Sequence, residues 1–277
     1  MATEPRRPDE LVAMSRLPML ADRVSSLLQE PARWSITHVG RTGSTNADLA
    51  SATGLPHGRV LVTEEQIAGR GRSGRDWFCP PGAGLIFSVL LRLPQVPPER
   101  YGWTGALLGL ATVRSLRSFD VVARLKWPND VLIEGRKCAG ILGEVAGAAL
   151  VIGTGINVSL VATELPRADA TSLWLSGAGA GALDRGALLA GILDQFGGLL
   201  DRWVAAGGDV DFSGLRAEYR QACSTIGSRV RLQLPGGAEV LAAAADVAAD
   251  GSLIVADGAG RRTTYSAADV IHLLPGS

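Results

Sequence analysis

The sequence predicts an α+β protein in which a mixed sheet flanked by helices is followed by a small β domain. Two long segments, Tyr101–Phe119 and Ala187–Ala205, have the length and apolar content of core-facing helices. The continuous apolar run Leu85–Leu91 is typical of a buried strand, and further short strands are expected on both sides of it. After Ser224, turn signals separate short β-like pieces, which indicates a small all-β module.

These patterns divide the chain into three parts. Residues 1–33 are charged and contain proline, so we expect a leader with one short surface helix around Leu20–Gln29. Residues 34–223 form the main domain and residues 224–277 the β domain. Within the main domain, the Gly- and Ala-rich piece Gly177–Ala182 is expected to be a flexible surface loop.

The remaining predicted elements are short. A helix is expected at Thr45–Ala52, because turn residues precede it. A long loop rich in Gly, Arg and Pro is expected at Glu64–Gly84. Further strands are predicted at Trp34–Gly40, Arg59–Thr63, Val121–Lys126, Val131–Glu134, Cys138–Val145 and Ala149–Gly153, and in the β domain at Arg229–Leu234, Val240–Ala245, Leu253–Ala256 and Thr263–Ser266.

Composition excludes several classes of protein. Hydrophobic residues make up 47% of the chain and charged residues 19%, which is typical of a globular protein. The formal net charge is zero, so no general basic field exists to hold nucleic acid. No apolar stretch reaches a membrane-spanning length, and the N-terminus lacks the apolar core of a signal peptide.

Cysteine and histidine usage favours a cytoplasmic protein without a structural metal. The three cysteines lie far apart and form no CxxC pair, so the sequence predicts no disulfide framework. With only three isolated histidines, a structural zinc site is not expected. These residues are Cys79, Cys138 and Cys223, and His38, His57 and His272.

The segment Glu64–Trp77 carries the most informative motif. Gly69, Gly71 and Gly74 spell G-x-G-x-x-G, but a dinucleotide-binding loop must open a helix, whereas prolines follow here. A protein kinase is excluded because the chain has no H-R-D or D-F-G element.

The arginines between these glycines are the stronger signal. Arg70, Arg72 and Arg75 place three guanidinium groups on one loop, and guanidinium forks suit phosphate and carboxylate. Because these charges repel one another, we expect the loop to be mobile when empty and to order over a bound polyanion. An exposed turn with solvated charges is the alternative.

Two further motifs follow predicted strands. In KWPND, Pro128 fixes a turn that leaves Asn129 and Asp130 at a strand end. Asp130 is a candidate to orient an amine or to help hold magnesium, although Asn-Asp turns are also common without any function. In GRKCAGILGEV, Lys137 opens an apolar strand and is a candidate to neutralise a carboxylate and an α-phosphate as they meet. A surface lysine beside a hairpin turn is the alternative.

Two weaker motifs complete the set. In TGSTNADL, Ser44, Thr45 and Asn46 begin a short helix, and plain N-capping would explain them if they stood alone. In VIGTGINV, the glycines permit close approach of a ligand, and Asn157 supplies an amide.

With these five motifs in order, the chain resembles the biotin–protein ligases. GSTN, QIAGRGRSGRDW, KWPND, RKCAGILGEV, GTGINV and the stretch ATSL carry the resemblance, which covers residues 34–274. It implies a catalytic domain similar to the class II synthetases and a C-terminal SH3-like β-barrel. It also implies ATP and biotin as substrates, with Mg²⁺.

The resemblance implies a role for each site residue. Lys137, Asp130 and Arg72 would be catalytic, with Asp130 a candidate magnesium ligand. Biotin would be bound by Ser44, Thr45, Asn46, Gln66, Gly69, Arg70, Gly71, Arg72, Lys137, Gly140 and Gly153. ATP or the adenylate would be bound by Arg72, Arg75, Trp77, Lys126, Asn129, Lys137 and Asn157.

The implied reaction has two steps. The biotin carboxylate attacks the α-phosphate of ATP, and pyrophosphate leaves. A lysine of a biotin carboxyl carrier domain, from acetyl-CoA carboxylase or a related carboxylase, then attacks the acyl carbon and expels AMP. Two anions meet in the first step, so cations are needed, and a closing loop must keep water from the mixed anhydride.

Three alternatives stay open at this point. A ligase of the same fold for lipoate or octanoate would need a longer, apolar pocket. A biotin sensor that binds DNA would need a basic recognition helix near the N-terminus, and the segment before residue 34 is too short for a winged domain. A nucleotide-binding protein with accidental motifs is the third. We expect a cytoplasmic monomer or weak homodimer that binds neither DNA nor membrane.

Overall fold

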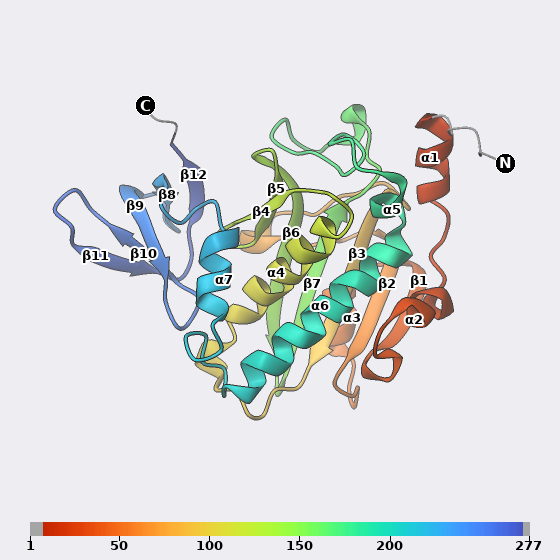
Figure 1. Ribbon diagram of the computed structural model, residues 1–277, viewed down its shortest axis with the longest axis horizontal. Helices are drawn as coiled ribbons and strands as arrows, with labels where there is room; N and C mark the ends of the chain where they lie inside the picture. The colour runs from red at the N-terminus through yellow and green to blue at the C-terminus, as the bar shows by residue number, and fades with distance from the viewer. Residues whose placement is uncertain (1–7, 274–277) are drawn as a thin grey trace.

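The protein is built around two sheets that lie side by side (Figure 1). The computed structural model describes residues 8–273. The ends of the predicted leader and of the predicted β domain, residues 1–7 and 274–277, lie outside this range. Within it, no helix is long and apolar enough to cross a membrane.

The larger sheet has seven strands in the order β1-β2-β3-β7-β6-β5-β4. Only β1 and β2 pair in parallel, and every other neighbouring pair is antiparallel, so the predicted mixed sheet is confirmed. The helix α3, Thr45–Ser51, connects the parallel pair. The strands are β1 Ser35–Thr42, β2 Arg59–Gln66, β3 Gly84–Leu91, β4 Ala123–Lys126, β5 Asp130–Ile133, β6 Arg136–Ala146 and β7 Ala149–Asn157.

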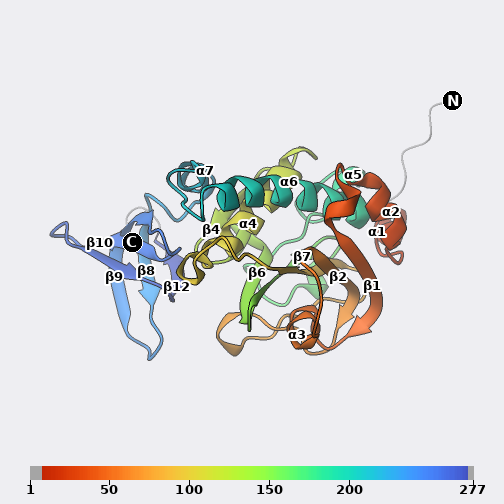
Figure 2. The ribbon, with the colours of Figure 1, turned by 90° about the horizontal axis from the view of Figure 1, so that it is seen from below.

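The two faces of this sheet have different partners. Side chains alternate between the faces along each strand. Phe87, Ile141 and Ile152 belong to the main core, under α4 (Trp103–Arg117) and α6 (Arg185–Ala205). On the opposite face, β6 and β7 present three small residues, Gly140, Gly153 and Gly155, and α3 packs on that side (Figure 2). The small residues leave room for a cavity on that face.

The helices extend the predicted core and correct one expectation. The buried side of α6 includes Phe196, whose ring stacks on Trp34 with centroids 6.3 Å apart. The segment expected to be a flexible loop, Gly177–Ala182, instead leads into α5, Ala180–Leu183. Ala182 is buried against the core, so apolar contact orders this low-complexity piece.

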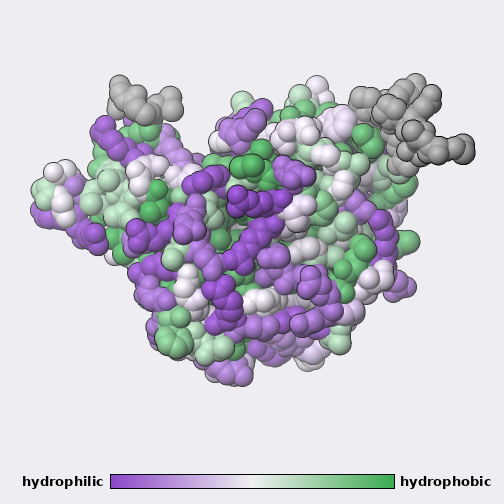
Figure 3. All heavy atoms as spheres, viewed as in Figure 1, coloured by the Kyte–Doolittle hydropathy of each residue, from purple (hydrophilic) through white to green (hydrophobic). Residues whose placement is uncertain are grey.

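Several elements were not expected from the sequence. Short 3-10 turns lie at Pro31–Arg33, Arg72–Gly74, Pro98–Arg100 and Ala162–Glu164, and α7 spans Leu215–Ala222. On the face in view in Figure 3, hydrophilic side chains cover much of the outer side of α6 and α7. This helical side is therefore an ordinary solvated surface.

The N-terminal helices α1 (Pro8–Ser15) and α2 (Ala21–Leu27) are tied to the sheet by a buried ionic cluster. Arg185, whose side chain is 2% exposed, donates to the Ser15 and Leu17 carbonyls and pairs with Glu64 at 2.5 Å. Glu64 also accepts from the Met19 N–H at 2.9 Å. The segment predicted as a leader with one surface helix therefore contributes to the interior.

Burial alone would raise the pKa of Glu64, but the Met19 N–H, Arg185 and His38 together hold that pKa below its ordinary value. A carboxyl with a lowered folded-state pKa stabilises the fold above its ordinary pKa, about 4.3. That stability is lost as the pH falls through the folded-state pKa.

We expect Glu64→Ala to lower the free energy of unfolding at pH 7 by about 3–5 kcal/mol, because it leaves Arg185 buried without its counter-charge. Urea titration between pH 3 and 7 would check this. The free energy of unfolding of the variant should fall less steeply on acidification than that of the wild-type protein. Asp201→Asn is the control, since it breaks a pair in which Asp201 is 65% exposed and should cost about 1 kcal/mol or less. Equal losses in the two variants would contradict the prediction.

The smaller sheet is five-stranded and antiparallel, in the order β11-β10-β9-β8-β12. No pairing between its edge strands β11 and β12 occurs within residues 8–273, so hydrogen bonds do not close it into a barrel there. Its strands are β8 Arg229–Gln233, β9 Glu239–Val247, β10 Leu253–Ala256, β11 Arg262–Tyr265 and β12 Asp269–His272, of which the sequence analysis missed β12.

Two buried tryptophans fix the smaller sheet to the larger one. The indole N–H of Trp103 donates to the Ala248 carbonyl, and that of Trp127 donates to the Gly251 carbonyl, both at 3.0 Å. Trp127 also belongs to the KWPND motif. Because of these bonds, the turn between β9 and β10 is held beside α4 and the KWPND motif.

Candidate active site

A cavity of about 910 Å³ opens on the small-residue face of the larger sheet. The Gly- and Arg-rich loop and residues of β12 also line it. It brings together all but one of the sequence-predicted site residues, namely Ser44, Thr45, Asn46, Gln66, Arg70, Gly71, Arg72, Arg75, Trp77, Lys126, Asn129, Asp130, Lys137, Gly140, Gly153 and Asn157. The exception is Gly69, which is not among the lining residues because it packs against the main chain of Trp77.

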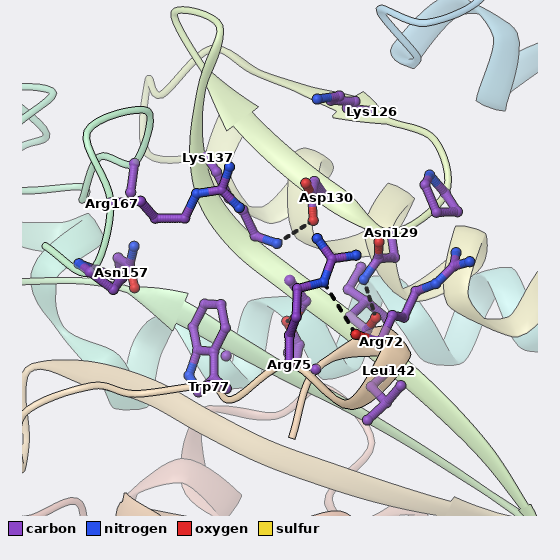
Figure 4. Close-up of a pocket in the computed structure, with 18 of the residues that line it drawn as sticks. Arg72, Arg75, Trp77, Lys126, Asn129, Asp130, Lys137, Leu142, Asn157 and Arg167 are labelled. Atoms are coloured by element: carbon purple, nitrogen blue, oxygen red, sulfur yellow. Dashed lines mark hydrogen bonds and ion pairs between the residues drawn. The ribbon is translucent and has the colours of Figure 1, made fainter. Parts of the chain in front are cut away.

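Two glycines form a flat floor beneath Trp77. Gly140 and Gly155 face each other across β6 and β7, and the indole of Trp77 lies over them. Figure 4 shows this indole inside the cavity. A Cβ on Gly155 would come within 2.6 Å of the indole Cζ2, so only glycine fits here. The indole N–H of Trp77 is buried and has no hydrogen-bond partner. This leaves a donor available beside the cavity.

A cluster of uncharged polar side chains forms one end of the cavity. Gln66 Oε1 accepts from the Thr45 N–H at 2.8 Å and lies 3.1 Å from the Thr45 hydroxyl. The Ser88 hydroxyl lies 2.7 Å from Thr45 Oγ1 and 2.6 Å from Asn46 Oδ1. Ser44 caps α3 by accepting from the Ala47 N–H. N-capping and cavity lining therefore occur in the same motif.

Lys137 and Asp130 form an ion pair in the middle of the cavity wall (Figure 4). Their Nζ and Oδ1 atoms are 2.5 Å apart, and each side chain is about one-fifth exposed. Lys137 Nζ also lies 6.0 Å from the centre of the Trp77 ring. Asn129 donates to the Ile141 carbonyl at 2.9 Å and so fixes the KWPND turn on β6. The ammonium group of Lys137 therefore reaches the cavity from β6, a strand that the KWPND turn helps to fix.

The Gly- and Arg-rich loop folds as a small hairpin at the mouth of the cavity. The Gly71 N–H donates to the Arg75 carbonyl at 2.6 Å, and the Trp77 N–H donates to the Gly69 carbonyl at 2.9 Å. At its tip, Arg75 pairs with Asp269 of β12 at 2.6 Å. Burial lowers the pKa of the Arg72 guanidinium.

The charges that line the cavity are unequal in number. Seven cationic side chains face four anionic ones. The sequence contains only two lysines, Lys126 and Lys137, and both are among the lining residues. Burial lowers the pKa of Lys126, which is half-buried at the end of β4. The excess of positive charge suits a ligand that carries several negative charges.

Sequence analysis missed several lining residues. Ser88 lies in a strand whose apolar pattern indicates only burial, and its hydroxyl faces the cavity. Arg124 alternates with buried neighbours on β4, and that alternation is a signal that could have identified it. Arg167 and Asp269 come from a loop and from the smaller sheet, and no local pattern marks them.

The remaining polar groups of the cavity bear on nucleotide and metal binding. The Asn157 side chain donates to the Thr171 carbonyl at 2.9 Å, and its Oδ1 is buried without a partner. Within residues 8–273, no group of three or more His, Cys, Asp or Glu side chains could hold a metal ion. A magnesium ion that is bound mainly by phosphates needs only one or two carboxylates from the protein, and Asp130 would supply one.

Two family models match the chain. The model of the biotin/lipoate A/B protein ligase family matches residues 38–159. The model of the biotin protein ligase C-terminal domain matches residues 225–273. Together, the fold and these two matches define a protein ligase of the biotin/lipoate class.

Individual relatives make the assignment narrower. The chain is 42% identical, over 85% of its length and 88% of the relative, to the biotin–[acetyl-CoA-carboxylase] ligase of Mycobacterium tuberculosis. It is 37% identical to the bifunctional ligase/repressor BirA of Escherichia coli, over 59% of this chain and 53% of that protein. The chain belongs to the biotin protein ligase family.

A solved structure shares the fold. The biotin protein ligase from Aquifex aeolicus, in complex with biotin and ATP, superposes with a TM-score of 0.72. The superposition covers 86% of this chain and 98% of that one, at 24% identity.

Proposed function

We propose that this protein is an ATP-dependent biotin–protein ligase that forms biotinyl-5′-AMP and transfers biotin to a lysine of a carrier protein. One observation carries the proposal: a single cavity joins a cluster of uncharged hydrogen-bonding groups to a mouth with excess positive charge. This arrangement suits an acid with a polar ring at one end and a nucleotide beside its carboxylate. The close relative with the same activity in its name supports it.

The polar end of the cavity favours biotin over lipoate or octanoate. Gln66 Oε1 is held by Thr45, so the Gln66 amide group keeps its two N–H donors for a ligand. Serine and threonine oxygens nearby supply acceptors, and a ureido ring offers both N–H groups and a carbonyl. A dithiolane ring or an alkyl chain offers neither, so it would leave these buried polar groups unpaired, which is unfavourable.

In the first step, we propose that Lys137 lies between the biotin carboxylate and the α-phosphate. Both groups are anionic, and an ammonium group between them would offset their repulsion during attack. Lys137 must then leave Asp130, its partner at 2.5 Å. Arg72 and Arg75 would contact the remaining phosphate oxygens, while Trp77 packs against the adenine.

In the second step, Asp130 is the proposed partner of the acceptor lysine. Once Lys137 has turned to the acyl phosphate, the Asp130 carboxylate can accept a hydrogen bond from the incoming amine and orient it. The amine attacks the acyl carbon, the C–O bond to phosphate breaks, and AMP leaves. Magnesium, which we propose enters with ATP, would neutralise phosphate charge with Asp130 as its protein ligand.

The proposal also assigns a part to each segment. Residues 34–223 would carry both steps, residues 224–273 of the predicted β domain would support the mouth of the cavity, and residues 8–33 of the predicted leader would brace the sheet. The proposed acceptor is the biotin carboxyl carrier domain of acetyl-CoA carboxylase or a related carboxylase. A cytoplasmic location, a monomer or weak homodimer, and the lack of DNA binding stay predictions from the sequence.

ATP–pyrophosphate exchange tests the function most directly. The purified protein should exchange label between pyrophosphate and ATP with biotin, and not with lipoate or octanoate. Transfer of biotin to a purified carrier domain should follow. Exchange with lipoate or octanoate instead would overturn the substrate, and no exchange with any of the three acids would overturn the enzyme.

The hairpin loop provides a prediction about ordering. We expect biotin plus ATP to protect the bonds after Arg70, Arg72 and Arg75 from trypsin by about 5-fold or more, because phosphates offset the crowded positive charge. Asp269→Asn should increase cleavage of the empty protein, since it removes the partner of Arg75. Asp257→Asn, which affects an exposed pair with Arg261 inside the smaller sheet, is the control. Cleavage unaffected by ligands would contradict the expected ordering.

A further inference from the structure

We infer that Glu144, which does not line the cavity, sets the direction of the hydrogen bonds in its polar end and thereby its preference for biotin. Glu144 lies on β6, two residues beyond the lining residue Leu142. Its carboxylate accepts from Asn46 Nδ2 at 2.7 Å. This inference rests on the proposed function and adds a positioning residue to it.

The neighbours of the Asn46 amide fix its orientation. Its nitrogen faces two acceptors, the Glu144 carboxylate and, at 3.1 Å, the Leu142 carbonyl. Neither of these groups can donate. The amide oxygen must therefore point the other way, toward Ser88 Oγ at 2.6 Å. There is no spare room at that point, because a Cβ on Gly153 would overlap the same oxygen.

This orientation fixes the next two protons. An amide oxygen only accepts, so the single proton of Ser88 must be donated to Asn46. The contact of 2.7 Å between Ser88 and Thr45 then requires the Thr45 hydroxyl to donate. Gln66 Oε1 keeps its bond from the Thr45 main chain. A one-way chain of donors thus runs from Thr45 through Ser88 and Asn46 to Glu144.

The consequence appears at the surface of the cavity. Thr45 and Ser88 have used their protons within the chain, so they offer a ligand only lone pairs. Gln66, with its oxygen occupied, offers only N–H groups. A ligand that fits must bring N–H donors to the hydroxyl side and a carbonyl acceptor to Gln66, and a cyclic urea has both. A negative charge at Glu144 keeps this pattern from reversing.

A substitution series at Glu144 tests the direction of the chain. Glu144→Gln retains an acceptor oxygen and should change KM for biotin by less than about 3-fold. Glu144→Lys presents only donors, so the Asn46 amide loses the charged acceptor of its nitrogen and keeps only the Leu142 carbonyl. The direction of the amide, and with it that of the Ser88 proton, is then no longer fixed. We expect KM for biotin to rise by about 10-fold or more, as for a site whose buried polar groups are left unpaired. KM for ATP should stay within about 2-fold of the wild-type value in both variants, because the contact lies at the far end from the phosphates.

Glu99→Lys provides the matched control, because it makes the same charge change at an exposed residue that does not line the cavity. Thermal melting and calorimetric titration with biotin accompany each variant. If Glu144→Lys fails to fold, Glu144→Ala takes its place and should bind biotin more weakly than Glu144→Gln. Equal biotin affinity in the Gln and Lys (or Ala) variants would overturn the inference, as would a parallel rise of KM for both substrates. A wild-type protein that shows no biotin-dependent exchange would overturn the proposed function instead.

Discussion

Replacing Lys137 by alanine is expected to reduce biotin-dependent ATP–pyrophosphate exchange by roughly 100- to 1,000-fold, the usual effect of removing one charge-stabilising group from a transition state. Lys137 contacts both the Asp130 carboxylate and the region under Trp77. Without its ammonium group, the biotin carboxylate and the α-phosphate would approach each other with their repulsion uncompensated. Exchange rates at saturating biotin and ATP measure this directly.

Stability should fall less than in Glu64→Ala, because the Lys137–Asp130 pair lines the cavity and keeps about one-fifth of each side chain exposed, whereas Arg185 is buried. Arg136→Ala is the matched control, since Arg136 is an exposed cation one residue earlier on β6 and does not line the cavity. Lys137→Arg keeps the positive charge but replaces the compact ammonium group with a planar guanidinium. It should recover part of the activity. Exchange in Lys137→Ala within a few-fold of the wild-type rate would exclude this lysine from the first step.

Gly155→Val is expected to raise KM for ATP by on the order of 100-fold, the effect of misplacing a binding group by about 1 Å. Any side chain at this position enters the space of the Trp77 indole, which must then leave the floor of the cavity. Trp77 is the proposed adenine contact, so nucleotide binding should be lost first. Biotin binding, measured by calorimetry without nucleotide, should weaken much less because the polar end lies elsewhere on the sheet.

Gly140→Ala is the control for this effect. Gly140 is the cross-strand partner of Gly155 and lies under the same indole. A Cβ there would lie 3.3 Å from Trp77 and from the flexible end of Lys137, so small shifts can accommodate it. We expect an increase of KM for ATP of less than about 10-fold. If the two variants behaved alike, the steric account of the Trp77 platform would be wrong.

The motifs located the site because each lies where a strand begins or ends. KWPND connects β4 to β5, and the Gly- and Arg-rich loop follows β2, so residue type and strand position together indicated a shared cavity. Hydrophobic patterns also indicated most of the strands and both long helices, and the family resemblance implied the mixed sheet. These features depend on neighbours along the chain, which are visible in a sequence.

Features that depend on distant partners were not predictable in the same way. The pairing of Arg75 with Asp269 joins residues far apart in sequence, and β12 is a strand of only four residues. Arg185 precedes the helix predicted from Ala187 and belongs to no motif, yet it is buried against Glu64 and the turn after α1. The contacts of the Ser88 hydroxyl could not be predicted, because Ser88 lies within an apolar strand. Hydrophobic periodicity shows which residues are buried but not what they contact.

The placement of the two lysines has a chemical consequence. Apart from the N-terminal amine, Lys126 and Lys137 supply the only primary amines of the 277-residue chain, and every other basic side chain that is charged at neutral pH is a guanidinium. Guanidinium groups stay protonated at neutral pH and react poorly with acylating agents. An activated acyl group that escaped from the cavity would therefore find almost no acceptor on the surface of the protein that made it. For the same reason, an amine-selective label would report on the cavity itself, and protection of these two positions would measure its occupancy.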